Sequence, residues 1–389
     1  MKRARVTVTM PGAVVEFDHV TKRYGERPPA VDDLSLTVHA GEICVLVGPS
    51  GCGKTTTMKM VNRLVEPSSG RVLIDGRDVA SLSAVELRRR IGYVIQQVGL
   101  FPHLTVGENV AVVPRLLGWE RGRIARRVEE LLELVGLDPA AYCDRYPSQL
   151  SGGERQRVGV ARAMAGDPPV MLMDEPFGAV DPIRRERLQN EFLRLQQELR
   201  KTVIFVTHDV DEAIKMADRI AVMQPGGRLA QSAPPDEILA APANEFVERF
   251  VGVDRGLKRL SLARVRDLRL EPAATALIGE PHSVARRRLE RSGARWAVAV
   301  DGERRPIGWL DAHELQGDGD VTGELAVPGA PLLEPESTLR DALSVLLSAG
   351  VKLGAVVDAR GELLGLLSVD AISATLRRGR PAQPAARSG

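Results

Sequence analysis

Nine residues, Gly48–Thr56, have the types and the spacing of a phosphate-binding loop. They contain the pattern G-x-x-x-x-G-K-T and directly follow the apolar run Ile43–Val47. Glycine allows a tight turn and brings backbone N–H groups against phosphate oxygens with no side chain between them. The Lys54 ammonium would reach the β- and γ-phosphates, and the Thr55 hydroxyl would ligate Mg²⁺. The pattern predicts a nucleoside triphosphate site lined by Gly48, Pro49, Ser50, Gly51, Cys52, Gly53, Lys54, Thr55 and Thr56.

Two adjacent carboxylates, Asp174 and Glu175, end a second apolar run, Val170–Met173. A buried strand at this position would deliver both acids to the edge of the sheet beside the phosphate loop. Asp174 suits a place behind the bound Mg²⁺, and Glu175 could orient or deprotonate the attacking water. The pair therefore predicts hydrolysis of the triphosphate, with an acidic turn at a strand end as the alternative.

A third segment, Leu150–Gln156, places Ser151, Gly152 and Gly153 before an arginine-rich helical stretch. This order predicts a helix start whose N–H donors are unobstructed, and such a start binds anions through those donors and the helix dipole. One chain would then carry two phosphate-binding devices. We interpret the second device as a sign that two chains share each nucleotide.

The elements that position these residues are visible as short runs that are apolar at every position. Such runs are typical of a parallel sheet that is covered on both faces. Helical patterns separate them, and two further segments, 14–17 and 34–38, alternate as strands with one covered face do. We predict α/β structure with a mainly parallel sheet over residues 14–240, built on the runs Ile43–Val47, Val170–Met173, Val203–Val206 and Ile220–Met223.

The remaining chain contains a weak internal repeat with an offset of 57 residues. Each copy predicts a helix, a glycine, a strand, an aspartate turn, a second strand and then the start of a further helix. Two such copies would bury their apolar faces against one another. The matched pairs are Ala285 and Ala342, Leu289 and Leu346, Gly293 and Gly350, Val298 and Ala355, Val300 and Val357, Asp301 and Asp358, and Gly308 and Gly365.

Length and composition set the outer bounds. At 389 residues the chain predicts more than one domain, and its 44% apolar and 27% charged residues are typical of a soluble globular protein. A net charge of +2 gives no indication of a nucleic-acid partner, and three scattered cysteines indicate reduced thiols. No apolar run approaches the roughly 18 residues of a membrane span. We expect an extension at 1–13, a linker at 241–259, the repeat at 260–376 and a disordered basic tail at 377–389.

Together these motifs resemble the ATPase subunit of ATP-binding cassette (ABC) transporters over about residues 14–240. Gly48–Thr55 resembles the Walker A loop of that family, Val170–Glu175 its Walker B segment and Leu150–Gln156 its signature. The resemblance implies a P-loop NTPase cassette with a mainly parallel sheet and a helical subdomain. It also implies ATP and Mg²⁺ as the bound cofactors.

The resemblance gives roles to four residues that spacing alone would leave as structural. Tyr24 would stack on adenine, and Gln96 would join the Mg²⁺ site to the transmembrane partner. His208 would contact the γ-phosphate. Asp181 would belong to the D-loop, although Gly178 stands where the family usually has serine.

The family also implies partners. Two chains would form a head-to-tail dimer around two ATP molecules, with Ser151 and Gly153 of one chain facing the γ-phosphate held by Lys54 of the other. Closure on ATP and reopening after hydrolysis would drive the transmembrane permease subunits between two states. The segment Leu100–Thr105 would fit the groove that receives a coupling helix, or else be a core loop.

Two longer stretches, Ile91–His103 and Pro242–Gly252, are similar to the glycine betaine/carnitine/choline branch of bacterial importers. That branch commonly carries a tandem pair of CBS domains, which the 57-residue repeat resembles as a smaller α+β domain. The resemblance implies an ATPase at the cytoplasmic face of the cell membrane, attached through a permease and served indirectly by a substrate-binding protein. An importer for another amino acid or amine, and a non-transport ABC ATPase, are the alternatives.

The CBS resemblance departs from the family pattern for nucleotide binding. Nucleotide-binding copies end with Thr or Ser and, three residues later, an Asp that holds the ribose. Here Ala371 follows Ser368 at that spacing, while the first copy has Asp311 and Glu314. We therefore do not expect an adenosine ligand at these positions, and dimerisation or sensing of another signal are the roles left open.

Overall fold

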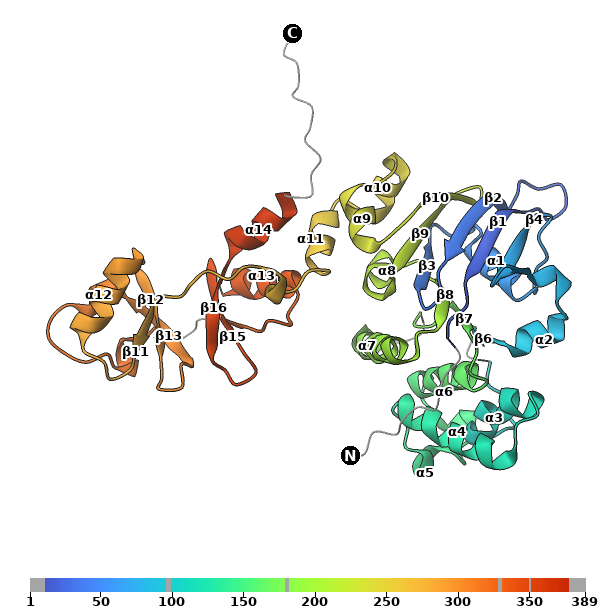
Figure 1. Ribbon diagram of the computed structural model, residues 1–389, viewed down its shortest axis with the longest axis horizontal. Coiled ribbons are helices and arrows are strands. Elements are labelled where there is room, and N and C mark those ends of the chain that lie inside the picture. Colours follow the sequence, from blue (N-terminus) through green and yellow to red (C-terminus); the bar gives the residue numbers. More distant parts are fainter. Residues whose placement is uncertain (1–10, 96–98, 179–181, 328–330, 350, 378–389) are drawn as a thin grey trace, which may run out of the picture. The chain divides into compact units, whose positions relative to one another are not determined.

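The computed structural model describes residues 11–95, 99–178, 182–327, 331–349 and 351–377 (Figure 1). The chain divides into two compact units, residues 1–252 and 253–389. Each unit has its own hydrophobic core, so each is described by itself.

A six-stranded sheet with the order β10-β9-β3-β8-β7-β6 forms the centre of the first unit. All pairs from β9 to β6 are parallel, and β10 pairs antiparallel at one edge. Every residue of β3, β7 and β8 is buried, as their uninterrupted apolar runs predicted. The mainly parallel α/β fold is thus confirmed. The strands are β3 (Ile43–Val47), β6 (Ile91–Val94), β7 (Val170–Asp174), β8 (Thr202–Val206), β9 (Arg219–Gln224) and β10 (Arg228–Ala233).

A smaller antiparallel sheet covers part of this unit, with the order β2-β1-β4-β5. Its strands are β1 (Val15–Lys22), β2 (Val31–Val38), β4 (Ser69–Ile74) and β5 (Arg77–Asp78). Alternate residues of β2, among them Leu34 and Leu36, are buried in a core that includes Leu46 of β3 and Met58 of the first helix. The alternation of these strands therefore reflects one face turned to that core.

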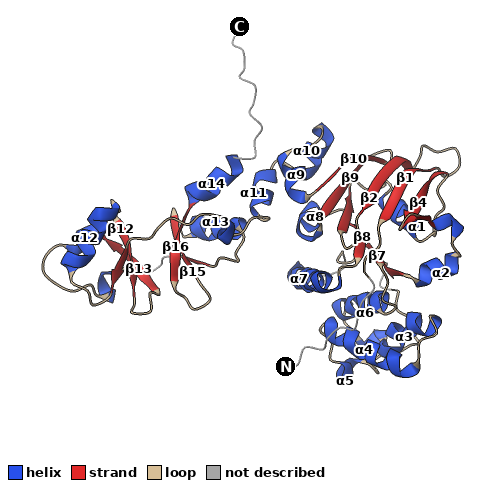
Figure 2. Ribbon diagram, viewed as in Figure 1, coloured by secondary structure: helices blue, strands red, loops and turns tan. Residues whose placement is uncertain are grey.

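Helices surround the parallel sheet, and four of them form a separate cluster beyond its β6 edge (Figures 1 and 2). In that cluster α4 buries Ile124, Val128, Leu131 and Leu132, one stripe of an amphipathic helix. The clustered helices are α3 (Val106–Leu116), α4 (Arg121–Leu134), α5 (Pro139–Tyr142) and α6 (Gly152–Met164). The others are α1 (Lys54–Val61), α2 (Ala84–Arg89), α7 (Pro182–Leu199), α8 (Val210–Met216), α9 (Pro235–Ala240) and α10 (Glu245–Val251).

The segment 241–259, expected as a linker, is helical over most of its length. α10 buries Val247 and Val251 in the core of the first unit. α11 (Arg255–Leu260) belongs to the second unit, where Leu260 is buried. The sequence does not show this division, because the basic stretch 255–259 predicts a solvent-exposed segment, although the next residue, Leu260, packs in the core of the second unit.

The second unit consists of two copies of one motif. The first copy has β11 (Thr275–Leu277), α12 (His282–Ser292), β12 (Trp296–Val300) and β13 (Pro306–Asp311), and its sheet order is β11-β12-β13. The second has β14 (Leu332–Leu333), α13 (Leu339–Ser348), β15 (Leu353–Val357) and β16 (Leu363–Ser368), in the order β14-β15-β16. In both copies a parallel pair is followed by an antiparallel pair.

The copies agree in register as well as in order. Asp301 and Asp358 make the same turn, each accepting two backbone N–H groups on one carboxylate oxygen. Val298 and Ala355 meet in one core cluster, so the copies pack on each other as the repeat predicted. They differ after the last strand, where the second copy continues into α14 (Val369–Arg377) and the first has only a short 3₁₀ turn. The matched Gly350 lies outside the described residues.

None of the helices in the described ranges combines the length and the apolar character that crossing a bilayer requires.

Candidate nucleotide-binding site

The phosphate loop connects β3 to α1 and is shaped by glycines that no other residue could replace. Gly48 has φ +151° and Gly53 has φ +95°. A Cβ atom at Gly48 would overlap the Met223 carbonyl of β9, and one at Gly53 would overlap the Ala30 carbonyl. The loop is therefore held between neighbouring strands with its backbone in a conformation that L-residues rarely adopt.

Lys54 is the first residue of α1, and its side chain lies across the loop. Its Nζ donates to the carbonyls of Gly48 at 2.8 Å and Pro49 at 2.9 Å, and it lies 3.7 Å from Cys52 Sγ. The side chain is only 7% exposed. A buried ammonium whose partners are neutral carbonyls and a thiol can turn its donors to phosphate oxygens when an anion enters the loop. The structure thus places the Lys54 ammonium against the loop backbone.

Thr55 and Asp174 meet beside the loop. The Thr55 hydroxyl donates to Asp174 Oδ1 at 3.2 Å, which joins the start of α1 to the end of β7. Burial raises the pKa of Asp174, with the Thr55 hydrogen bond acting against that effect. The two side chains present hard oxygen donors, the chemistry that Mg²⁺ prefers.

Glu175 and His208 form the next pair along the sheet edge. His208 Nδ1 lies 3.1 Å from Glu175 Oε1, and Glu175 N donates to the Val206 carbonyl of β8. Glu175 has φ +44°, a left-handed conformation that is uncommon outside glycine. The neighbouring strand thus fixes the backbone of this acid, and the structure brings the predicted base and histidine together.

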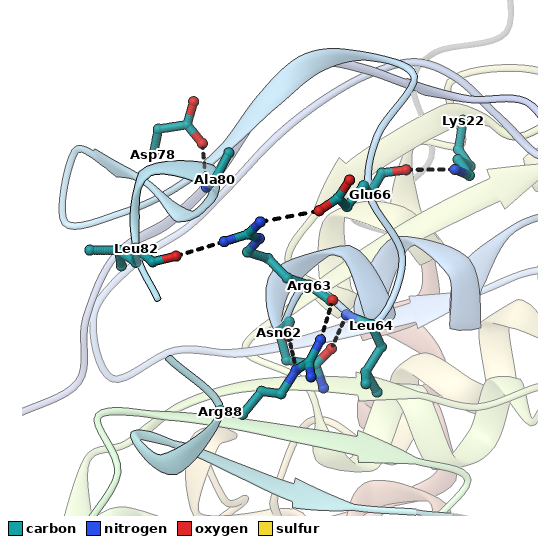
Figure 3. Close-up of polar contacts among 9 residues, drawn as sticks. All are labelled: Lys22, Asn62, Arg63, Leu64, Glu66, Asp78, Ala80, Leu82 and Arg88. Atoms are coloured by element: carbon teal, nitrogen blue, oxygen red, sulfur yellow. Dashed lines mark hydrogen bonds and ion pairs between the residues drawn. The ribbon is translucent and has the colours of Figure 1, made fainter. Parts of the chain in front are cut away.

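Tyr24 follows β1 on an exposed turn and is 47% exposed. Lys22 Nζ lies 5.1 Å from the centre of its ring and also donates to the Glu66 carbonyl at 2.7 Å. Figure 3 shows how the segment after α1 is held around this anchor: Arg63 donates to Leu82 and Glu66, and Arg88 donates to the Asn62 and Arg63 carbonyls. The accessible ring can accept a flat partner such as a nucleobase.

Ser151 is the residue that caps the start of α6. Its hydroxyl accepts the Glu154 N–H at 3.3 Å, and Glu154 Oε2 accepts the Ser151 N–H at 2.6 Å, which is a capping box. Nothing lies within 4 Å of a Cβ built at Gly152 or Gly153, so this helix start opens outward. Among the hydrogen bonds and ion pairs of the described residues, none joins it to the phosphate loop.

Two predicted residues, Gln96 and Asp181, lie outside the described ranges. The structure adds three side chains that the sequence analysis missed. Gln156 of α6 donates to the Pro176 carbonyl just after Glu175, and Tyr142 donates to Glu154. Only Glu154 had a local signal, because S-x-x-E is the sequence pattern of a capping box.

In the second unit, the side chains at the candidate ribose-binding positions make hydrogen bonds within the chain. Ser368 Oγ donates to Glu271 Oε1 at 2.6 Å and accepts the Ala371 N–H at 3.1 Å. In the first copy Asp311 accepts the His313 N–H and lies near Arg295. The Ser368 hydroxyl is thus bonded to a carboxylate of its own chain.

Comparison with known proteins places this geometry in a family. Residues 31–178 match the family described as ABC transporter, and residues 323–377 match the CBS domain. The osmoprotectant import ATP-binding protein OsmV of Salmonella typhimurium is 47% identical, over 94% of this chain and 97% of that protein. The glycine betaine/carnitine/choline transport ATP-binding protein OpuCA of Bacillus subtilis is 44% identical, over 91% of this chain and 94% of that protein.

Solved structures of ABC transporter cassettes resemble the first unit. The dimeric structure of MJ0796, a bacterial ABC transporter cassette, is 34% identical with a TM-score of 0.51, covering 57% of this chain and 98% of that one. A post-hydrolysis dimeric state of the same cassette, bound to ADP and Pi, matches at 33% identity and the same TM-score. With the phosphate loop, the paired acids and the open helix start in place, this chain belongs to the ATP-hydrolysing, ATP-binding proteins of ABC transporters, with CBS sequence in its second unit.

Proposed function

We propose that the chain is the ATP-hydrolysing subunit that powers uptake of a quaternary-ammonium osmoprotectant, of the glycine betaine, choline or carnitine type, through a membrane permease. The observation that carries this proposal is similarity over nearly the whole chain, second unit included, to proteins named for import of such solutes. An importer for another amine is the second candidate, because this subunit would not touch the solute.

ATP and Mg²⁺ are the proposed cofactors. Lys54 and the loop N–H groups would hold the phosphates, and Thr55 and Asp174, together with Gln96, would hold Mg²⁺. Bound Mg²⁺ would neutralise charge on the β- and γ-phosphates. Glu175, fixed by β8, would accept the proton of the attacking water, while His208 would keep its carboxylate in place and contact the γ-phosphate.

Two copies of the chain are proposed to share each nucleotide. A phosphate loop that is complete within its own unit and a helix start that opens outward are what a head-to-tail pair requires. Ser151, Gly152 and Gly153 of one copy, with Asp181, would then close the site around Lys54 of the other.

The segment Leu100–Thr105 is the proposed permease contact. Its backbone is shaped by the buried side chain of Asn109, which donates to the carbonyls of Phe101, Leu104 and Thr105 and accepts the Phe101 N–H. Phe101 is nevertheless 42% exposed. A rigid loop that presents an aromatic side chain is typical of a binding surface. This contact would hold the chain at the cytoplasmic face of the membrane, with a substrate-binding protein acting indirectly.

The proposal is tested by uptake of labelled glycine betaine at high osmolarity in a strain without other betaine systems. Cells that carry Lys54→Ala should lose uptake, whereas Lys215→Ala, which removes a lysine paired with Glu186, should not. Unchanged uptake with Lys54→Ala would overturn the assignment to this solute class.

A further inference from the structure

The carboxylate of Glu154 links two parts of the helical cluster. Its Oε2 accepts the Ser151 N–H at 2.6 Å, and its Oε1 accepts the Tyr142 hydroxyl at 2.7 Å. The hydrogen bond from Tyr142 is the main reason why the pKa of Glu154 is lowered to about 2. Both oxygens of this acid are thus engaged, one by the helix start and one by α5.

Contacts with neighbouring residues fix the position of Tyr142. The Arg145 guanidinium lies 4.4 Å from the centre of its ring. The residue that follows Tyr142, Cys143, accepts the Gly107 N–H at 2.9 Å, and Arg145 accepts the Val106 N–H at 2.8 Å. A Cβ at Gly107 would overlap Cys143 Sγ, so α5 and the start of α3 pack at the closest distance that glycine allows.

A carboxylate in the first turn of an anion-binding helix carries the same sign of charge as the anion, so its position matters for binding. Free to move, Glu154 would repel the phosphate that the helix start must accept, and it would release the Ser151 backbone. The phenol of Tyr142 holds this carboxylate, and Arg157 offsets part of its charge. The open faces of Gly152 and Gly153 are then left for the incoming anion.

We propose that Tyr142 is a positioning residue for the shared nucleotide site, acting through Glu154 on Ser151. The inference rests on the proposed function, because Ser151 matters to ATP only if a second copy supplies the nucleotide. It predicts that the Tyr142 hydroxyl controls closure of two ATP-loaded chains, while binding of ATP to a single chain does not depend on it.

The test uses the full chain carrying Glu175→Gln, so that ATP is bound and not hydrolysed. Two quantities are measured: the affinity of the dilute single chain for ATP, and the ATP-dependent dimer dissociation constant by analytical ultracentrifugation. Tyr142→Phe should leave the first unchanged and raise the second about tenfold, because the Glu154 carboxylate that it releases would oppose the phosphate at both shared sites of the dimer. Tyr146→Phe is the matched control, since both Glu154 oxygens are engaged by other groups.

A double-mutant cycle separates positioning from general stability. If Tyr142 acts through Glu154, then Tyr142→Phe adds little further loss in a Glu154→Ala background. Full additivity, an equal fall in single-chain ATP affinity, or a dimer as tight as the parent would each overturn the inference. A parent chain that never dimerises with ATP, or one whose dimer is insensitive to Ser151→Ala, would instead refute the shared site and this inference with it.

Discussion

The phosphate loop and the start of α6 are both anion-binding elements of the first unit, and they are built in opposite ways. The phosphate loop is enclosed by its own unit. Its glycines, Gly48 and Gly53, have positive φ angles and pack against neighbouring backbone. The buried Lys54 ammonium donates to a carbonyl of the loop itself. The helix start is open: space is free around its two glycines, and a capping box between Ser151 and Glu154 satisfies part of its backbone. The loop can bind a triphosphate within one chain, whereas the helix start needs an anion brought by another.

The largest effect on ATP binding is expected when the phosphate loop is altered. Lys54→Ala removes the cation that donates to the loop carbonyls of Gly48 and Pro49, so ATP affinity should fall about 100-fold and hydrolysis with it. Isothermal titration with ATP measures this directly, and Lys215→Ala serves as the control. Unchanged affinity would mean that the loop is misassigned.

The next variant separates binding from chemistry. Glu175→Gln keeps the size and the strand contact of the side chain but removes the base beside His208. Hydrolysis should slow by about 10²–10⁴-fold while ATP affinity is retained. Single-turnover hydrolysis with labelled ATP checks the prediction, and normal turnover would rule out Glu175 as the base.

The substitution Gly153→Asp impairs the start of α6. Space is free at this position and its backbone is helical, so the chain should fold and a single chain should bind ATP normally. The added carboxylate would oppose the phosphate of a second chain and reduce steady-state hydrolysis at least about tenfold. Gly122→Asp is a matched control, because Gly122 is also the second residue of a helix with open space around it. Equal activity of the two variants would argue against a shared site.

The smallest effect concerns pH. Because the pKa of Glu154 is lowered to about 2 from its ordinary 4.5, its ionised form stabilises the folded state above pH 4.5, and this contribution is lost as pH falls toward about 2. Tyr142→Phe should therefore lower the free energy of unfolding at pH 6, and the difference from wild type should shrink below pH 4.5. Urea unfolding across this range measures it, and a difference that stays constant with pH would exclude the contact.

Much of this architecture could be predicted because the signals are local. Within β3, β7 and β8, the runs Ile43–Val47, Val170–Met173 and Val203–Val206 are apolar at every position because both faces of these strands are buried. The 57-residue repeat reproduces its register in the two copies. β6 was not predicted, because Gly92 and Tyr93 interrupt its apolar run. Tyr142 was missed for another reason: its partner is twelve residues away, and only the path of the chain through α5 and the next turn brings them together.

The claim that two chains share each nucleotide is tested most directly by mixing two impaired chains. Lys54→Ala lacks a working loop but keeps an intact helix start, and Gly153→Asp has the reverse defect. Mixed dimers would contain one site with both elements intact, so the mixture should hydrolyse ATP faster than either chain alone. A Gly153→Asp chain that by itself hydrolyses ATP at the wild-type rate would contradict the account.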